Sequence, residues 1–165
     1  MEISNKKMNI TYLVGDATAP QTEGKKIIAH ICNDLGKWGK GFVLAISKRW
    51  KTPEIIYKRS FAGIDTPVLG DVQFISVEPD IIIANIIGQK GVRSLHDIKS
   101  PAPINYNAVR QGLMTIADYA LENNASVHMP RIGCGLAGGS WEKIEPIITD
   151  TLLKKNIVTN VYDFK

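Results

Sequence analysis

The chain has 165 residues, of which 44% are hydrophobic, and its formal net charge is +4. This length suits one domain, residues 1–165, and its two cysteines, Cys32 and Cys134, are too few for a disulfide framework or a cysteine metal site. No apolar run approaches the roughly 18–20 residues of a membrane span, and MEISNKKMNI at the start lacks the apolar core of a signal peptide, so we expect a cytoplasmic protein with no metal and no membrane association.

The N-terminal half alternates apolar strand patterns with helical patterns. MNITYLVGD, residues 8–16, and KKIIAHIC, residues 25–32, are apolar and rich in β-branched residues, which predicts two strands. KGFVLAISKRW, residues 40–50, repeats apolar side chains at helical spacing and predicts a helix. TPEIIYKRSF, residues 52–61, predicts a second helix with Thr52 as its N-cap and a proline at the first helical position.

The C-terminal half continues the same alternation. DVQFISVEPD, residues 71–80, and IIIANII, residues 81–87, predict two further strands. The longest helix pattern covers residues 104–124, where an apolar stripe ends at two asparagines. The remaining expected elements are a strand over residues 125–130, a helix over 140–156 that Ser140 opens, and a closing strand over 157–164.

Strands that alternate with helices indicate an α/β fold, with helices on both faces of a mainly parallel sheet. In such sheets ligands bind at the carboxyl ends of the strands. Two glycine-rich loops follow predicted strands here: HICNDLGKWGKGF, residues 30–42, and MPRIGCGLAGG, residues 129–139. Each leads into a predicted helix, where glycine amides and a helix N-terminus attract anions, so the pair suits a ligand with two phosphates.

Familiar nucleotide and catalytic motifs do not occur in the sequence. Neither glycine run closes with the Gly-Lys-Ser/Thr of a P-loop, and GKWGKG has the wrong spacing for a dinucleotide fingerprint. We expect Cys32 and Cys134 to be small buried fillers rather than nucleophiles. His128 is expected in the core, and His30 suits a core role at least as well as a catalytic role.

Taken as a set, YLVGDAT, IAHICNDLGKWGKGFVLAISKRW and MPRIGCGLAGG with its following tryptophan resemble the macrodomain family of ADP-ribose-binding modules. The chain looks most similar to the branch of ADP-ribose 1''-phosphate phosphatases and terminal ADP-ribose protein glycohydrolase. The resemblance covers nearly the whole chain in order. It implies a three-layer α/β/α fold around a mixed, mainly parallel sheet of roughly six strands, and no cofactor.

The resemblance also implies roles for single residues. Asp16 would accept a hydrogen bond from the adenine amino group, and the Ala17 amide would meet the ring. The loop from Asn33 to Phe42 would wrap the distal ribose and one phosphate, and the loop from Gly133 to Gly138 would cradle the diphosphate. Asp16 and Asn33 also suit plain turn positions. The implied ligand-binding set is Asp16, Ala17, Asn33, Gly39, Lys40, Gly41, Phe42, Gln89, Arg131, Gly133, Cys134, Gly135, Leu136, Ala137 and Gly138.

Two positions depart from the glycohydrolase pattern. That branch has a catalytic aspartate after GCGL, where this chain has Ala137. At the branch's catalytic lysine this chain has Gly88 or Gln89, and Lys90 follows. We therefore expect little or no release of ADP-ribose from protein by a lysine–aspartate mechanism. Gln89 and Lys90 still lie at a strand end that faces the same cleft, although Lys90 also suits a solvated loop.

Two functions from different classes follow. In the first, the chain is a hydrolase that removes the 1''-phosphate of an ADP-ribose derivative, with Asn33, Asp34 and Lys90 as its catalytic residues and the loop amides stabilising charge. In the second, it is a reader of free ADP-ribose or of an ADP-ribosylated protein, without activity. A glycohydrolase with a non-standard site is a further alternative. RNA binding has only the net charge in its favour, so we expect no nucleic acid partner, and we expect a monomer.

Overall fold

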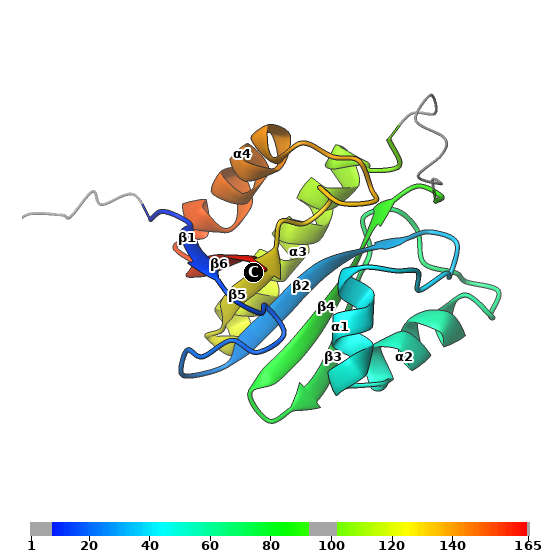
Figure 1. Cartoon of the computed structure of the whole chain (residues 1–165), viewed down its shortest axis with the longest axis horizontal. Coiled ribbons are helices and arrows are strands. Elements are labelled where there is room, and N and C mark those ends of the chain that lie inside the picture. The colour runs from blue at the N-terminus through cyan, green and yellow to red at the C-terminus, as the bar shows by residue number, and fades with distance from the viewer. Residues whose placement is uncertain (1–7, 93–101, 165) are drawn as a thin grey trace, which may run out of the picture.

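The computed structural model describes residues 8–92 and 102–164. They form a six-stranded sheet with the strand order β1-β6-β5-β2-β4-β3 and with helices on both faces (Figure 1). Residues 1–7, which carry most of the N-terminal stretch considered for export, lie outside the described residues. The strands are β1 (Thr11–Val14), β2 (Lys26–Asn33), β3 (Val72–Glu78), β4 (Ile81–Gln89), β5 (Ser126–Pro130) and β6 (Thr159–Asp163).

The sheet is mixed and mainly parallel, as the sequence predicts. At its centre β2 pairs in parallel with β4 and β5, while β6 pairs in parallel with β5 and β1. At one edge β3 pairs antiparallel with β4. Because the parallel strands share one direction, their carboxyl ends meet along the same side of the sheet, and the loops that follow them converge there.

Helices cover both faces, which confirms the three-layer α/β/α architecture (Figure 1). On one face lie α1 (Phe42–Arg49) and α2 (Thr52–Ser60). On the other face lie α3 (Tyr106–Asn123) and α4 (Trp141–Thr151), and α4 is followed by a 3-10 turn at Leu153–Lys155. Among the described residues, no helix combines the length with the apolar composition that a membrane span requires.

Two hydrophobic cores, one on each side of the sheet, hold the layers together. Alternate residues of β2 face opposite cores: Ile27 and Ala29 pack with α3 and α4, whereas Ile28 and Cys32 pack with α1 and α2. Cys32 is buried, as predicted. Because β2 and β4 are buried on both faces, they appear in the sequence as continuous apolar runs rather than as alternating patterns.

The ends of α3 follow the sequence signals, whereas the start of α2 does not. Asn105 caps α3 by accepting a hydrogen bond from the Ala108 amide (2.9 Å), and Asn124 ends the helix in the left-handed conformation with φ of 50°. The prediction that Thr52 caps α2 is wrong, because Lys51 holds the N-cap position and Thr52 is the first helical residue. The reason is that Lys51 already has helical backbone angles, so the helix begins one residue early.

Gly112 lets α3 approach the sheet, and we predict that Gly112→Ala destabilises the fold. A Cβ on Gly112 would lie 2.6 Å from Cγ2 of the buried Ile86, so the core must shift. Overpacking of this kind costs about 1–3 kcal/mol, which exceeds the roughly 1 kcal/mol that alanine gains over glycine in a helix. The urea midpoint should fall accordingly.

The matched control for this variant is Gly63→Ala. A Cβ on Gly63 would meet nothing within 4 Å, so this change should leave the midpoint unchanged or raise it slightly. A Gly112→Ala protein as stable as the wild type would show that α3 does not need the close approach.

Candidate functional site

A cleft with two adjoining chambers lies where the carboxyl ends of the parallel strands meet α1. The apolar chamber has a volume of about 310 Å³ and the glycine-loop chamber one of about 280 Å³. Gly41, Phe42 and Pro130 line both. The apolar chamber is further lined by Gly15, Asp16, Ala17, Ala45, Tyr162 and Phe164. The glycine-loop chamber is further lined by His30, Ile31, Lys40, Val43, Gln89, Arg131, Ile132, Gly133, Gly135, Leu136 and Ala137.

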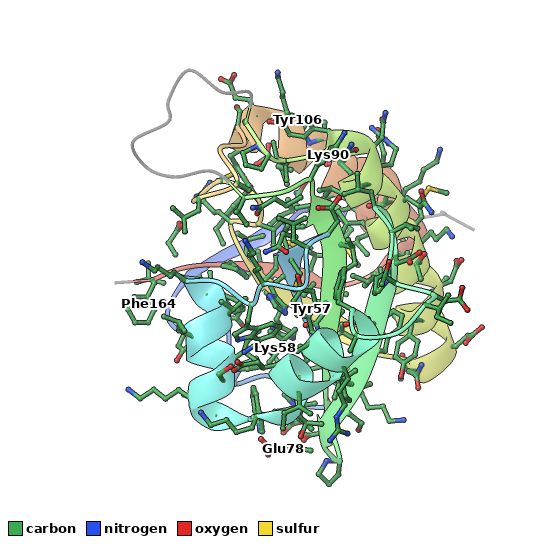
Figure 2. All side chains as sticks on the ribbon, turned by 90° about the vertical axis from the view of Figure 1, so that its right-hand side faces the viewer. Tyr57, Lys58, Glu78, Lys90, Tyr106 and Phe164 are labelled. Atoms are coloured by element: carbon green, nitrogen blue, oxygen red, sulfur yellow. The ribbon has the colours of Figure 1, made fainter. Side chains whose placement is uncertain are left out.

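Two aromatic residues near the end of the chain contribute to the apolar chamber. Phe164 is 83% exposed, and Figure 2 shows its ring standing clear of the ribbon. Tyr162 is buried, and its hydroxyl forms a hydrogen bond with Nδ1 of His128 (2.8 Å). His128 is fully buried, as predicted. Sequence reasoning missed both aromatic residues, because the closing strand gives no signal that its end borders a cleft.

Asp16 presents its carboxylate to the apolar chamber while several hydrogen bonds fix it. Thr18 donates to Oδ1 from its amide (2.8 Å) and from its hydroxyl (2.7 Å), and Arg49 donates to Oδ2 (3.3 Å). Burial by itself raises the pKa of Asp16, but the bonds from Thr18 and Arg49 outweigh burial and hold that pKa below its ordinary value. Asp16 is therefore part of the chamber wall, and it is also a turn residue, the alternative role that the sequence indicates.

The N-terminus of α1 lies where the two chambers adjoin. Gly41 holds the N-cap position with φ of 89°, a conformation that favours glycine. The amides of Phe42 and Val43 have no acceptor among residues 8–92 and 102–164. The positive end of the helix dipole therefore faces the cleft. Lys40 also lines the glycine-loop chamber, whereas Gly39, predicted to bind ligand, lines neither chamber.

The glycine loop, residues 131–139, uses most of its glycines to close on itself. Gly139 donates to the Gly133 carbonyl (2.7 Å), and a Cβ on Gly139 would lie 2.5 Å from that oxygen. Gly138 has φ of 73° and donates to the Gly135 carbonyl (3.0 Å). Gly135 differs, because a Cβ there would meet nothing within 4 Å and its φ is not left-handed. The loop therefore does not require glycine at position 135, where the missing side chain leaves space open beside the chamber.

Part of the glycine loop presents backbone amides that have no acceptor among the described residues. The residues that carry these amides all line the glycine-loop chamber. By contrast, the Cys134 amide donates to the Arg131 carbonyl (3.3 Å), and neither Cys134 nor Gly138 lines the chamber. Within residues 8–92 and 102–164, no acceptor is found for the amides of Arg131, Ile132, Gly133, Gly135, Leu136 and Ala137.

His30 extends from β2 into the wall of the glycine-loop chamber and is 1% exposed. Its Nε2 donates to Oδ1 of the buried Asn85 (2.5 Å), and Asn85 Nδ2 donates in turn to Gln73 (3.3 Å). Burial lowers the pKa of His30 to about 4, so the ring is neutral at pH 7. His30 is thus a buried, hydrogen-bonded histidine that also forms part of the cleft.

Asn33 lines neither chamber, because its side chain forms hydrogen bonds within the loop that follows β2. The amide nitrogen donates to the Lys37 carbonyl (2.5 Å), and the amide oxygen accepts from the Leu35 amide (2.9 Å). Tyr57 of α2 donates to the same oxygen (2.8 Å) and points from its helix toward the sheet (Figure 2). Asn33 therefore shapes the loop, and its predicted contact with a ligand stays a prediction.

Asp34 and Lys90 also lie off the walls of the cleft. Asp34 accepts from the Gly91 amide (2.8 Å), and its own amide donates to the Gln89 carbonyl (3.0 Å). Gln89 lines the glycine-loop chamber, although its side chain donates to the Gly91 carbonyl (2.9 Å). Lys90 is exposed directly after β4 (Figure 2). The catalytic roles predicted for Asp34 and Lys90 stay predictions.

Arg131 lines the glycine-loop chamber, but its guanidinium has partners inside the protein. It donates to both oxygens of Asp163 (2.6 and 3.0 Å), and these bonds raise the pKa of Arg131 above its ordinary value. The rings of Tyr12 and Trp141 lie 5.1 and 5.2 Å from the guanidinium carbon, a cation–π arrangement. Arg131 thus ties β1, β6 and α4 to the end of β5.

The cleft offers backbone amides, one ionised carboxylate and cationic side chains, with little that could ligate a metal. In the part of the chain that the structure describes, no group of three or more His, Cys, Asp or Glu side chains is placed to hold a metal ion. The arrangement favours an elongated ligand with an apolar, amine-bearing end and an anionic centre.

The fold and the cleft agree with a solved structure. A macrodomain protein from Streptomyces coelicolor is 50% identical to this chain and matches it with a TM-score of 0.81, covering 94% of this chain and 99% of that one. The chain belongs to the macrodomain family. No family model matches it.

Two relatives with curated names also match the macrodomain. Over 94% of its length it is 31% identical to the Chromodomain-helicase-DNA-binding protein 1-like of Mus musculus, but it spans only 18% of that protein. It is 27% identical to the ADP-ribose 1''-phosphate phosphatase of Candida albicans, covering 93% of this chain and 98% of that protein.

The two buried histidines should make the macrodomain less stable in mild acid. Burial lowers the pKa of His30 and of His128 from 6.5 to about 4. Below pH 6.5 the histidines of the unfolded chain therefore bind protons, whereas those of the folded chain stay neutral. The free energy of unfolding falls as the pH drops toward 4. Each histidine should cost about 2 kcal/mol between pH 7 and pH 5, measured by urea unfolding.

His128→Gln tests this assignment without changing a residue that lines the cleft. The variant should lose about 2 kcal/mol less than the wild type between pH 7 and pH 5, because it lacks one of the two histidine rings whose pKa burial lowers in the described part of the chain. The carboxyl groups of Asp16, Asp80 and Asp163 have lowered pKa values and act below this window. Equal losses in both proteins would contradict the assignment to His128.

Proposed function

We propose that this macrodomain binds ADP-ribose. The observation that carries the proposal is the order of features along the cleft: an apolar chamber with an accepting carboxylate, a helix N-terminus, and a chamber lined by free amides. ADP-ribose has the matching order of adenine, diphosphate and distal ribose. The relative from Candida albicans, whose name refers to an ADP-ribose derivative, supports the same ligand.

In this proposal the adenine occupies the apolar chamber, where its amino group donates to Asp16 and its ring lies against Phe164. The diphosphate lies between the amides of Gly41–Val43 and those of residues 135–137. The distal ribose then extends along the glycine-loop chamber beside His30. Free amides and a helix N-terminus bind phosphate oxygens without a dedicated lysine.

We predict that ADP-ribose binds with a Kd between one and some tens of micromolar, or ~6–8 kcal/mol. Gly135→Val should weaken binding at least about tenfold, because its side chain would fill space that the ligand needs. The fold should survive, since a Cβ at Gly135 meets nothing within 4 Å. Calorimetry measures the affinity, and thermal unfolding checks the fold.

Gly63→Val is the matched control for this prediction. Gly63 also has no neighbour within 4 Å of its Cβ position and lines neither chamber, so this variant should bind like the wild type. Undiminished affinity in Gly135→Val would mean that the diphosphate lies elsewhere. A wild-type protein that fails to bind millimolar ADP-ribose would refute the proposal as a whole.

Hydrolysis of ADP-ribose 1''-phosphate is the second candidate function. The relative from Candida albicans carries the name of that activity, and the glycine-loop chamber offers amides and Lys40 to a second anionic group. Ala137 lines this chamber with a methyl group where the glycohydrolase pattern has a carboxylate, which argues against release of ADP-ribose from proteins. Asp34 is the candidate base of this proposal: it lies off the chamber walls, but its backbone amide donates to the carbonyl of Gln89, a residue that lines the chamber.

In an activity assay, the wild type should release phosphate from ADP-ribose 1''-phosphate and release no ADP-ribose from a glutamate-modified protein. Asp34→Asn should lower phosphate release at least about tenfold, as loss of a general base does. Its affinity for ADP-ribose should change little, because asparagine can still accept from the Gly91 amide. Asp65→Asn, an exposed acid outside the cleft, is the control.

The other outcomes of this assay separate the remaining functions. Tight binding without release of phosphate or ADP-ribose would identify a reader. Rapid release of ADP-ribose that Lys90→Ala abolishes would identify a glycohydrolase that works without the aspartate. Unchanged phosphate release by Asp34→Asn would exclude Asp34 as the base.

A further inference from the structure

The carboxylate of Asp16 is fixed by a ring of hydrogen bonds that joins two distant parts of the chain. Oδ1 accepts both bonds from Thr18, and Oδ2 accepts from Nη2 of Arg49 (3.3 Å). The ring closes because Nε of Arg49 donates to the Thr18 hydroxyl (2.8 Å). Arg49 is the last residue of α1, so the end of that helix holds the turn that follows β1.

These bonds determine what the carboxylate can still do. The Thr18 amide and hydroxyl use the two lone-pair directions of Oδ1, whereas Oδ2 has one contact and keeps one direction for a ligand in the apolar chamber. Every group in the ring donates to Asp16, so each favours the ionised form, which only accepts hydrogen bonds. A guanidinium cannot lose its charge in a protein and cannot reverse this polarity.

A fixed acceptor can distinguish purine bases by the group at position 6 of the ring. A 6-amino purine offers an N–H donor there, which pairs with the free direction of Oδ2. A 6-oxo purine such as hypoxanthine offers a carbonyl oxygen, which would face the carboxylate acceptor to acceptor. A polar group placed to receive a donor rejects analogues that lack one, because the group loses its partner on binding.

We infer that Arg49 and Thr18 are positioning residues that set the nucleobase specificity of the cleft. They hold Asp16 as an oriented acceptor, so the apolar chamber takes 6-amino purines and discriminates against 6-oxo purines. This inference rests on the proposed binding of ADP-ribose. Neither residue needs to touch the ligand, since neither lines a chamber.

Calorimetry with ADP-ribose and with inosine diphosphate ribose, its hypoxanthine analogue, tests the inference. The wild type should prefer ADP-ribose by about tenfold or more. Arg49→Ala should reduce this preference at least about fivefold, mainly by lowering the affinity for ADP-ribose. Arg49→Lys should reduce it too, because lysine keeps the charge but lacks the fork that contacts Thr18 and Asp16 together. Thr18→Val, which removes the hydroxyl at nearly constant shape, should act in the same direction.

Lys48→Ala is the matched control, since it removes an equal charge from the same turn of α1. The side chain of Lys48 is exposed and makes no hydrogen bond or ion pair with the described residues, so its loss should leave the preference unchanged. Circular dichroism should show that all variants fold, since the side chain of Arg49 is 45% exposed.

The possible results separate this inference from the proposed function. A wild type that binds neither ligand would refute the binding of ADP-ribose itself. A wild type that binds ADP-ribose, with Arg49→Ala keeping the same preference or weakening both ligands equally, would overturn the specificity role alone. Wild-type preference in Arg49→Lys would show that charge suffices and that the geometry of the guanidinium is irrelevant.

Discussion

Backbone amides that have no acceptor among the described residues are the constraint on which the cleft depends. An amide that is desolvated and left unpaired costs about 1–3 kcal/mol, so such groups must stay in contact with water or with a ligand. The free amides of α1 follow β2, and those of the glycine loop follow β5. Since β2 and β5 are paired in parallel, both sets reach the same cleft. Neighbouring parallel strands thus bring together two sets of backbone amides, an arrangement that suits an anion.

Side chains that look catalytic in the sequence serve the loops that carry these amides. Asn33 bonds to the Lys37 carbonyl and to the Tyr57 hydroxyl, and Asp34 bonds to the Gly91 amide. Asparagine and aspartate readily bond to nearby backbone, so the same residue types suit a turn and an active site. In this macrodomain, the hydrogen bonds of the Asn33 side chain fix the shape of its loop.

The sequence predicts most of the fold, because its elements depend on local patterns. The continuous apolar run of β4 and the apolar stripe of α3 suffice to identify both elements, and the glycines between predicted strands and predicted helices locate the two glycine loops. The sequence alone cannot distinguish the roles of Gly135 and Gly138. Gly138 is required by its φ of 73°, whereas Gly135 has open space around its Cβ position, and both facts depend on the folded loop. Phe164 was missed for a similar reason, since its place beside the cleft depends on how the sheet assembles.

The two ends of the cleft differ in how far the protein orders them before a ligand arrives. The glycine loop closes through its own hydrogen bonds, and Arg131 ties it to α4 through Trp141 and to β6 through Asp163. At the apolar end, by contrast, Phe164 is 83% exposed and must lose rotamer freedom to cover a base. Amides that are already ordered lose little conformational entropy when a ligand binds, whereas an exposed ring loses more. In the proposed complex with ADP-ribose, the diphosphate end would therefore be the main source of affinity, and the adenine end, where Asp16 is fixed, would be the source of selectivity.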